Sequence, residues 1–325
     1  MSHSTIDKVK LGGTDLSVST ICFGASGLGD MPDTYGYAVE EARAKATIAA
    51  IFDGPTNFID TSRIYGFGRS EERIGAVIRE RGGPPLGFVI STKLDRDPNT
   101  GRFDASQARR SIEQSLAALG VDKIDLLHVH DPEHADSLEE VTGPRGAIKE
   151  LFRIKQEGLA RAVGLAAGTV SVMMPLLRDF DFDALITHNR FTLTNRNAEG
   201  MIDLACARGV AVLNAAPYAG GVLAKGSGAY PRYVYQEASS ETLEPIRRIE
   251  AICAKYNVPP GAAALQFSTR DSRIASTICG VSKPERVRET LEWARFPIPE
   301  AVWEELKSVQ YSLNDPEATR AYSAG

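Results

Sequence analysis

The chain has 325 residues, 43% of them hydrophobic, and a formal net charge of −5 at neutral pH. A chain of this length buries roughly three quarters of the surface of its unfolded form, so one large core is stable without disulfides. The sequence has no basic block, no closely spaced cysteines and no apolar run of bilayer length, which argues against a nucleic-acid partner, a disulfide framework and a membrane span.

Short apolar runs typical of buried strands alternate with longer segments of helical periodicity along most of the chain. The strand candidates are residues 19–24, 57–60, 88–93, 124–130, 161–166, 184–189, 211–216 and 276–280. The helical patterns between them include residues 39–53, 70–81, 104–120, 146–158 and 199–209, several of which begin on Asp or Ser and end on Gly. Eight such units in succession predict a closed α/β barrel of the (β/α)8 or TIM type, in one domain over residues 1–325.

A glycine-rich stretch, TICFGASGLGDM (residues 20–31), follows the first strand. A turn that cradles a dinucleotide pyrophosphate needs a helix that begins directly after the glycines. Pro32 and Gly36 follow instead, and the first helical pattern begins only near Val39. We therefore expect a loop without a helix here, and no Rossmann fingerprint.

Polar residues stand at the carboxyl ends of three successive predicted strands, where barrels of this kind place their active sites. Asp60 ends the second strand and Tyr65 follows it, Lys93 ends the third, and His130 ends the fourth. Each alone is compatible with a structural role as a cap, a surface charge or a packing group. Together they predict an acid, a phenol, an amine and an imidazole that meet at one mouth of the barrel.

This combination suits proton exchange with a substrate oxygen. A neighbouring ammonium favours phenolate, so Lys93 is expected to lower the pKa of Tyr65 toward neutrality. Asp60 would balance the buried charge of Lys93, and His130 would orient a carbonyl or hydroxyl oxygen. No nucleophile elbow for acyl transfer occurs, so the missing component is a bound hydride carrier.

The motifs DTSRIYG, STK and IDLLHVHDP around these four residues closely resemble the aldo-keto reductase superfamily. The resemblance covers nearly the whole chain. It implies a (β/α)8 barrel that binds NAD or NADP, with Tyr65 as general acid or base, Lys93 and Asp60 tuning it, and His130 orienting the substrate. It further implies that residues 8–20 form a β-hairpin closing the bottom of the barrel, and that extra helices lie near the C-terminus.

The resemblance also implies cofactor contacts. Asn189 matches the residue that holds the nicotinamide carboxamide, Lys225 is a candidate phosphate partner, and Arg286 is a candidate for a 2′-phosphate. Gly280 and Thr290 depart from the pattern of NADP-selective relatives, so the choice between NAD and NADP stays open. The full expected set is Ala25, Asp60, Ala166, Asn189, Ala215, Pro217, Ala219, Gly221, Leu223, Lys225, Gly280, Ser282, Arg286 and Glu289.

Within the superfamily, the chain looks most like the D-threo-aldose 1-dehydrogenases, also called L-fucose dehydrogenases, together with pyridoxal 4-dehydrogenase. This similarity implies oxidation of a sugar hemiacetal to a lactone, with a pyridoxal dehydrogenase or an NADPH-dependent carbonyl reductase as alternatives. We expect the loops at residues 31–37 and 218–235 and the C-terminal tail to determine the substrate, with Tyr230, Tyr233, Tyr235 and Trp293 as candidates for stacking on its ring.

Two other classes of protein remain as alternatives. His128 and His130 form an H-x-H pair with His134 nearby, which would suit a metal-dependent hydrolase, although His188 and His3 alone remain to complete a ligand set. A non-enzymatic barrel that binds nucleotide is the other. We expect no metal and, because no signal segment is apparent, a cytoplasmic location; the oligomeric state is open.

Overall fold

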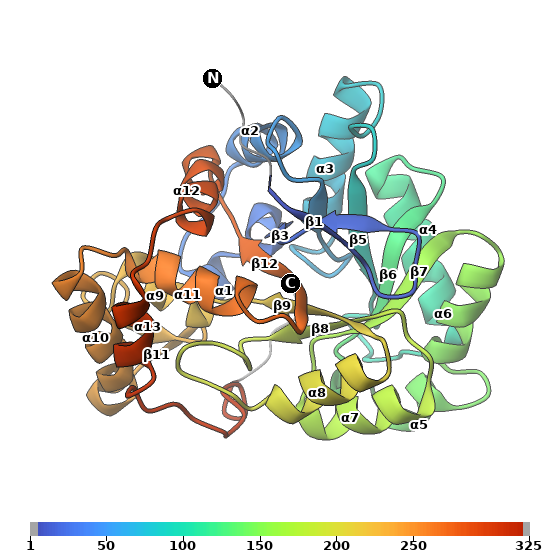
Figure 1. The fold of residues 1–325 in the computed structure, drawn as a ribbon. Coiled ribbons are helices and arrows are strands. Elements are labelled where there is room, and N and C mark those ends of the chain that lie inside the picture. Colours follow the sequence, from blue (N-terminus) through green and yellow to red (C-terminus); the bar gives the residue numbers. More distant parts are fainter. Residues whose placement is uncertain (1–5, 321–325) are drawn as a thin grey trace.

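The computed structural model describes residues 6–320, and its centre is a closed barrel of eight parallel strands (Figure 1). The strands follow the order β12-β3-β4-β5-β6-β7-β8-β9 around the barrel. They are β3 (Ile21–Gly24), β4 (Phe58–Asp60), β5 (Val89–Leu94), β6 (Ile124–His130), β7 (Ala160–Ala166), β8 (Ala184–His188), β9 (Ala211–Ala215) and β12 (Ile274–Gly280). Each boundary lies within two residues of its predicted place, so the (β/α)8 barrel is confirmed.

Helices surround the barrel and cover its outer face (Figure 1). Their ends follow the expected capping signals: the Asp104 side chain accepts a hydrogen bond from Gln107 N, and Gly120 ends the same helix at φ 70°. The outer helices are α2 (Glu41–Phe52), α3 (Arg69–Glu80), α4 (Ala105–Leu119), α5 (Leu138–Thr142), α6 (Ala147–Gln156), α7 (Val170–Asp179), α8 (Glu199–Ala207), α10 (Ser240–Lys255), α11 (Pro260–Thr269), α12 (Pro284–Ala294) and α13 (Glu300–Leu306).

The predicted hairpin is present as the antiparallel strands β1 (Lys8–Lys10) and β2 (Ser17–Ser19). Its apolar side chains Leu11, Leu16 and Val18 are buried in one cluster with Phe58 and Leu126 from inside the barrel. The hairpin therefore closes the barrel at the amino-terminal ends of the strands, opposite the predicted active site.

The expectation of a helix-free loop after β3 is wrong in one respect. A 3₁₀ turn, η1 (Ser26–Gly29), is followed by a single helical turn, α1 (Pro32–Tyr35). Proline has a backbone angle suited to the first helical position, and Gly36 ends the turn at φ 76° by donating its N–H to Pro32 O. The two residues read as helix breakers instead mark the two ends of a very short helix.

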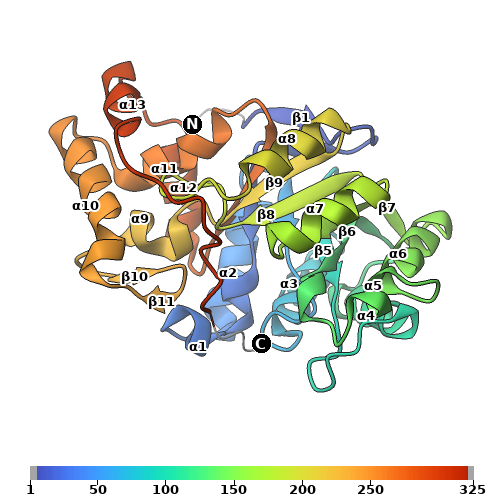
Figure 2. The same ribbon diagram turned by 90° about the horizontal axis from the view of Figure 1, so that it is seen from below.

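Two irregular segments border the mouth of the barrel. The long connection after β9 contains η3 (Ala219–Gly221), α9 (Val222–Lys225) and the two-stranded ribbon β10 (Arg232–Tyr233) with β11 (Gln236–Glu237). After α13 the chain continues as a tail, which Figure 2 shows in dark red running toward α1. A further short 3₁₀ turn, η2 (Pro132–His134), follows β6. Within residues 6–320, no helix has the length and apolar character needed to cross a bilayer.

Candidate active site

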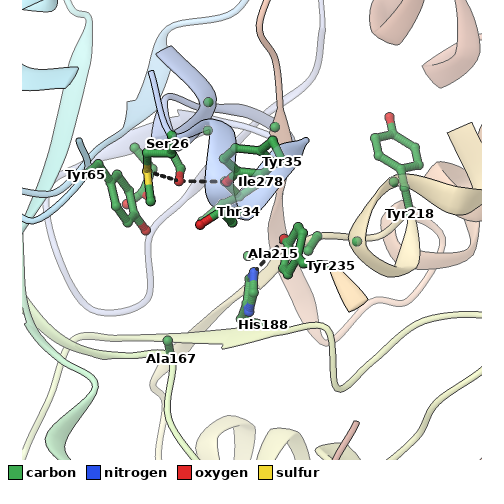
Figure 3. Close-up of a pocket in the computed structure, with 18 of the residues that line it drawn as sticks. Ser26, Thr34, Tyr35, Tyr65, Ala167, His188, Ala215, Tyr218, Tyr235 and Ile278 are labelled. Atoms are coloured by element: carbon green, nitrogen blue, oxygen red, sulfur yellow. Dashed lines mark hydrogen bonds between the residues drawn. The ribbon is translucent and has the colours of Figure 1, made fainter. Parts of the chain in front are cut away.

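The carboxyl ends of the strands surround a cavity of about 620 Å³, the size range of small-molecule sites. Asp60, Tyr65, Lys93 and His130 all line it. Parallel pairing explains this, because Asp60 lies beside Ser91 and Lys93 lies beside His128 in the register of neighbouring strands. Figure 3 shows Tyr65 in the wall of this cavity.

The loop that carries Tyr65 is fixed by a close backbone contact. Gly66 has φ 60°, and a Cβ atom there would lie 1.9 Å from Gly29 O in the glycine-rich stretch. Only glycine fits this position, since any side chain would clash with a carbonyl oxygen that cannot move aside. Gly29 of the TICFGASGLGDM stretch therefore helps to hold Tyr65 in place.

Lys93 and Asp60 form a buried ion pair. Lys93 Nζ lies 2.8 Å from Asp60 Oδ2 and 2.6 Å from Thr61 O, and the two side chains are only 2% and 6% exposed. Ser91 Oγ donates to the other carboxylate oxygen at 2.8 Å. The ammonium and the carboxylate thus compensate each other away from water, which makes this burial possible.

Tyr65 is a neutral phenol in this arrangement. Lys93 Nζ lies 4.9 Å from the centroid of its ring. Burial raises the pKa of Tyr65 well above its ordinary value, and the carboxylate of Asp60 raises it further. The expectation that Lys93 lowers this pKa is therefore wrong for the protein without a ligand, because Asp60 already offsets the ammonium charge.

His130 is held by a carboxylate that the sequence analysis did not consider. Asp95 Oδ1 lies 2.6 Å from His130 Nδ1, and the imidazole meets Tyr65 edge-on with ring centroids 5.8 Å apart. Burial alone would lower the pKa of His130, but the carboxylates of Asp131 and Asp95 outweigh it and raise the pKa above its ordinary value. The signal for Asp95 was its position two residues after Lys93, the predicted end of the third strand.

The H-x-H pair does not form a metal site. His128 faces Ser91, whose Oγ lies 3.4 Å from its Nδ1, and burial lowers its pKa well below the ordinary value. In the described part of the chain, no three His, Cys, Asp or Glu side chains are grouped to hold a metal ion. His3 lies outside the described residues. The hydrolase alternative therefore has no support from this geometry.

One end of the cavity is cationic. Lys225, Lys283 and Arg286 line it, and Arg232 lies close enough to act on Lys225. Burial and the charges of Arg286, Arg232 and Lys283 lower the pKa of Lys225 to about 8. Arg286 Nη1 lies 2.8 Å from Glu289 Oε2 and its guanidinium packs over Trp293. Cations that repel one another in this way are suited to binding an anionic ligand.

The C-terminal tail lies on the end of β8. Glu317 Oε1 lies 2.8 Å from His188 Nδ1 and accepts a hydrogen bond from Asn189 Nδ2 at 2.9 Å. Asp315 pairs with the buried Arg190 at 2.9 Å, and Arg320 pairs with Glu317 Oε2 at 3.1 Å. Sequence reasoning placed the tail near the substrate but did not identify these residues.

We expect the variant Glu317→Ala to loosen the tail, because it removes the partner of His188, Asn189 and Arg320 at once. Backbone amides of residues 312–318 should then exchange hydrogen at least about tenfold faster, as measured by hydrogen-exchange mass spectrometry. Glu304→Ala in α13, which removes an exposed pair with Lys307, is the matched control and should change nothing there. Unchanged exchange in Glu317→Ala would mean that other contacts hold the tail.

The pH dependence of this anchor has a defined sign. Burial alone would raise the pKa of Glu317, but His188, Arg190 and Asn189 outweigh it and hold the pKa well below its ordinary value of 4.5. A lowered folded-state pKa contributes stability that is complete above the ordinary value and is lost as pH falls through the folded-state value. The tail of the wild-type protein should therefore remain anchored at mildly acidic pH.

The structure divides the residues predicted to bind a cofactor into two groups. The cavity wall contains Asp60, Ala215, Gly221, Lys225, Gly280, Ser282 and Arg286. It does not contain Ala25, Ala166, Asn189, Pro217, Ala219, Leu223 or Glu289.

Two of the residues outside the wall have clear local reasons. The backbone of Ala25 is engaged internally, since its N–H donates to Asp60 O and its carbonyl accepts from Ser70 Oγ. Ala166 is buried in the cluster inside the barrel, whereas the next two residues, Ala167 and Gly168, line the cavity.

Asn189 lies just behind the wall with an unused acceptor. Its side chain is fully buried, and its Oδ1 has no hydrogen-bond partner among the described residues. A carboxylate can only accept hydrogen bonds, so the amide group of Asn189 must turn its nitrogen toward Glu317. Its oxygen, Oδ1, then points away from Glu317 and can accept from another donor. A buried acceptor without a partner is costly unless a ligand supplies the donor.

Aromatic side chains form a further part of the cavity wall. Tyr35 donates to Ser26 Oγ at 2.7 Å, and Tyr235 Oη lies 3.1 Å from His188 Nε2, as the dashed lines in Figure 3 show. The Tyr35 and Tyr235 rings meet edge to face at 5.6 Å. Of the four predicted stacking residues, Tyr235 lines the cavity, whereas Tyr230, Tyr233 and Trp293 do not.

Comparisons with known proteins agree with this geometry. The model of the aldo/keto reductase family matches residues 20–310. The chain is 30% identical to pyridoxal 4-dehydrogenase of Microbacterium luteolum, covering 93% of this chain and 97% of that protein. It is 29% identical to D-threo-aldose 1-dehydrogenase of a Pseudomonas species, covering 90% and 94%. The solved structure of an aldo-keto reductase from Bacillus halodurans in its holo form superposes with a TM-score of 0.77 at 19% identity, covering 97% and 100%.

Proposed function

The chain belongs to the aldo/keto reductase family of NAD(P)-dependent oxidoreductases, and from this premise we propose that it oxidises an aldose of the D-threo or L-fucose type to its lactone. The enzyme would act as a single barrel domain on a small sugar or aldehyde, and we further propose a cytoplasmic location. The observation that carries the proposal is the convergence of Asp60, Tyr65, Lys93 and His130 on one cavity.

The proposed roles follow from the contacts of these side chains. Tyr65 Oη would take the proton of a hemiacetal hydroxyl during oxidation, or give a proton to a carbonyl oxygen in the reverse direction. Because its pKa is raised, the phenol is protonated at rest and is ready to act as an acid in the reductive direction. In the oxidative direction it must first lose its own proton before it can take that of the hemiacetal hydroxyl. The Lys93–Asp60 ion pair would keep the Lys93 ammonium beside the Tyr65 ring. His130 would orient the substrate oxygen that exchanges a proton with Tyr65. When bound, the nicotinamide accepts or delivers the hydride.

The residues present fit a nicotinamide dinucleotide. The unpartnered Oδ1 of Asn189 suits the N–H groups of a carboxamide, and the cations Lys225, Lys283 and Arg286 suit phosphate groups. Gly280 has open space around its Cβ direction, which permits a ligand to approach the backbone after β12. We propose that these residues hold the two ends of the cofactor; the preference between NAD and NADP stays open.

Arg286→Ala tests the cofactor assignment. If the guanidinium binds a 2′-phosphate, the dissociation constant for NADP should rise at least about tenfold, a loss of about 1.4 kcal/mol, while that for NAD changes little. Fluorescence titration with each nucleotide measures both constants. Arg288→Ala removes an exposed arginine of the same helix and serves as the control. Equal weakening of NAD and NADP would reject this role for Arg286.

Pyridoxal is the second candidate substrate. The aromatic wall made by Tyr35, Tyr235 and His188 suits a flat pyridine ring as well as the apolar face of a sugar. The similarity to pyridoxal 4-dehydrogenase supports this candidate as strongly as the aldose dehydrogenase supports the first. An NADPH-dependent carbonyl reductase is a third candidate, which the same catalytic residues would serve in the opposite direction.

A substrate screen distinguishes these candidates. Purified enzyme would be mixed with L-fucose, L-galactose, D-arabinose or pyridoxal and with either oxidised nucleotide, and the near-ultraviolet absorbance of the reduced cofactor followed. Formation of reduced cofactor with a sugar supports the proposal, and formation only with pyridoxal favours the second candidate. Absence of turnover with every sugar would refute the aldose assignment.

A further inference from the structure

Asp95 connects the two sides of the active site through one carboxylate. It follows directly after β5, and its Oδ1 lies 2.6 Å from Nδ1 of His130. Its other oxygen, Oδ2, accepts hydrogen bonds from Ser62 Oγ at 2.5 Å and from Ile64 N at 2.9 Å. Because Ile64 directly precedes Tyr65, the same side chain contacts the imidazole and the loop that carries the phenol.

The carboxylate is itself held rigidly. Helix α4 fixes its backbone, since Asp95 N donates to Ser111 Oγ and Gln107 Nε2 donates to Asp95 O, each at 3.0 Å. The residue is only 3% exposed. Burial alone would raise the pKa of Asp95, but His130, Ser62 and Ile64 outweigh it and lower the pKa, so the group is ionised near neutral pH.

An ionised carboxylate determines which imidazole nitrogen carries the proton. Carboxylate oxygens only accept hydrogen bonds, so His130 Nδ1 must be the protonated nitrogen at their 2.6 Å separation. Nε2 is then the nitrogen left for the cavity. In the neutral imidazole Nε2 offers a lone pair that can hold a substrate hydroxyl by its proton as long as Tyr65 still carries its own, and in the charged imidazole Nε2 donates a hydrogen bond to a carbonyl oxygen.

We propose that Asp95 is a positioning residue of the reaction, which fixes His130 with Nε2 toward the substrate oxygen and fixes the Tyr65 loop against the same oxygen through Ile64. One anchor for both groups keeps their spacing constant while the substrate changes between alcohol and carbonyl. The predicted effect on kcat rests on the proposed function. The prediction of which imidazole nitrogen carries the proton does not.

Several other groups act on His130. Asp131 follows it, with Oδ1 3.7 Å from Nε2, and Lys93 lies on the neighbouring strand. Tyr65 faces the ring, and His128 and His134 lie on its own strand and in η2. Without Asp95, burial and Lys93 would lower the pKa of His130, while Asp131 alone would oppose them.

The test is Asp95→Asn, which keeps the size of the side chain. The new amide would donate to Nδ1 and move the imidazole proton to Nε2, so the lone pair for the substrate hydroxyl is lost. Because the substrate hydroxyl would lose the group that orients it, kcat for oxidation should fall about a hundredfold, with the cofactor dissociation constant unchanged. Asp97→Asn, the same change on an Asp of the same loop that accepts from Asn99 N and Thr100 N, should leave kcat unaltered.

NMR of the imidazole nitrogens supplies a measurement that needs no activity. The chain has five histidines, so the His130 signal can be assigned by its loss in His130→Gln. We expect wild-type His130 to carry its proton on Nδ1, and Asp95→Asn to move it to Nε2 and lower the titration midpoint by more than about one pH unit. Asp131→Asn should lower the midpoint without moving the proton. Above its titration midpoint, a neutral wild-type His130 protonated on Nε2 and not on Nδ1 would overturn the proposal, whether or not any variant folds.

A double variant separates positioning from a general effect on folding. In a His130→Ala background, Asp95→Asn should cost less than about threefold in kcat, because the imidazole is gone and the oxygen of the new amide can still accept from Ile64 N. A further loss as large as in the wild type would show that Asp95 acts on the fold and not on His130. If the wild-type enzyme turns over no sugar or aldehyde, the proposed function fails while the NMR result still decides the role of Asp95.

Discussion

Tyr65→Phe should abolish nearly all turnover while leaving cofactor binding intact. General acid–base catalysis by a positioned side chain contributes roughly a hundredfold to ten-thousandfold in rate, and removal of the hydroxyl should cost a factor in this range. The phenylalanine ring keeps the contacts of the tyrosine ring with Lys93 and His130, so the surrounding structure has no reason to move. Steady-state kinetics with the best substrate of the screen would give kcat, and fluorescence titration would give the nucleotide dissociation constants.

Tyr256→Phe provides the matched control. It removes a phenol hydroxyl that donates to Glu305 of α13, and neither residue lines the cavity. Its kcat should equal that of the wild type. If Tyr65→Phe retained wild-type turnover, the assignment of residue 65 as the proton-exchanging group would be wrong, and His130 would be the next group to test.

Lys93→Met should destabilise the protein strongly as well as inactivate it. The substitution leaves the Asp60 carboxylate buried without the ammonium that lies 2.8 Å from it. Removing one partner of a buried ion pair costs about 3–5 kcal/mol, because the other charge stays uncompensated in a medium of low polarity. Denaturant unfolding of the ligand-free protein would measure this loss in the free energy of unfolding.

An exposed ion pair supplies the comparison. Lys255→Met removes the 2.6 Å pair with Glu305, whose side chains are 61% and 36% exposed, and should change the free energy of unfolding by less than about 1 kcal/mol. The double variant Lys93→Met with Asp60→Leu should recover much of the stability without recovering activity, since it removes both charges. Equal losses in the free energy of unfolding for Lys93→Met and Lys255→Met would contradict the burial of the Lys93–Asp60 pair.

The barrel itself could be predicted from the sequence because its signal is local. Each buried strand is a short apolar run, and each helix has its own periodicity and caps, so no distant contact is needed to recognise either. The three residues at the strand ends, and Tyr65 in the loop after one of them, followed from the same reasoning, since the topology of parallel strands brings such ends together. The single helical turn α1 was not predicted, because proline and glycine, which stand at its two ends as Pro32 and Gly36, are also common in loops.

The parts that could not be predicted depend on contacts between distant residues. Glu317 is separated by 128 positions from Asn189, and Asp95 by 35 from His130, and neither pair leaves a mark on local periodicity. The raised pKa of Tyr65 is likewise a sum of burial and of several carboxylates from different elements. The prediction from the sequence had the wrong sign because it did not count the burial of the phenol, which is the largest cause of the raised pKa, or the direct effect of the Asp60 carboxylate on Tyr65.

The hairpin that fills the lower end of the barrel has a kinetic consequence. Leu11, Leu16 and Val18 close the barrel at the amino-terminal ends of the strands, and within the described structure the cavity lies at the opposite end. Cofactor and substrate must therefore enter and leave through the same mouth. If one of them lies beneath the other, that one must bind first and leave last, and initial-rate patterns would then show ordered binding.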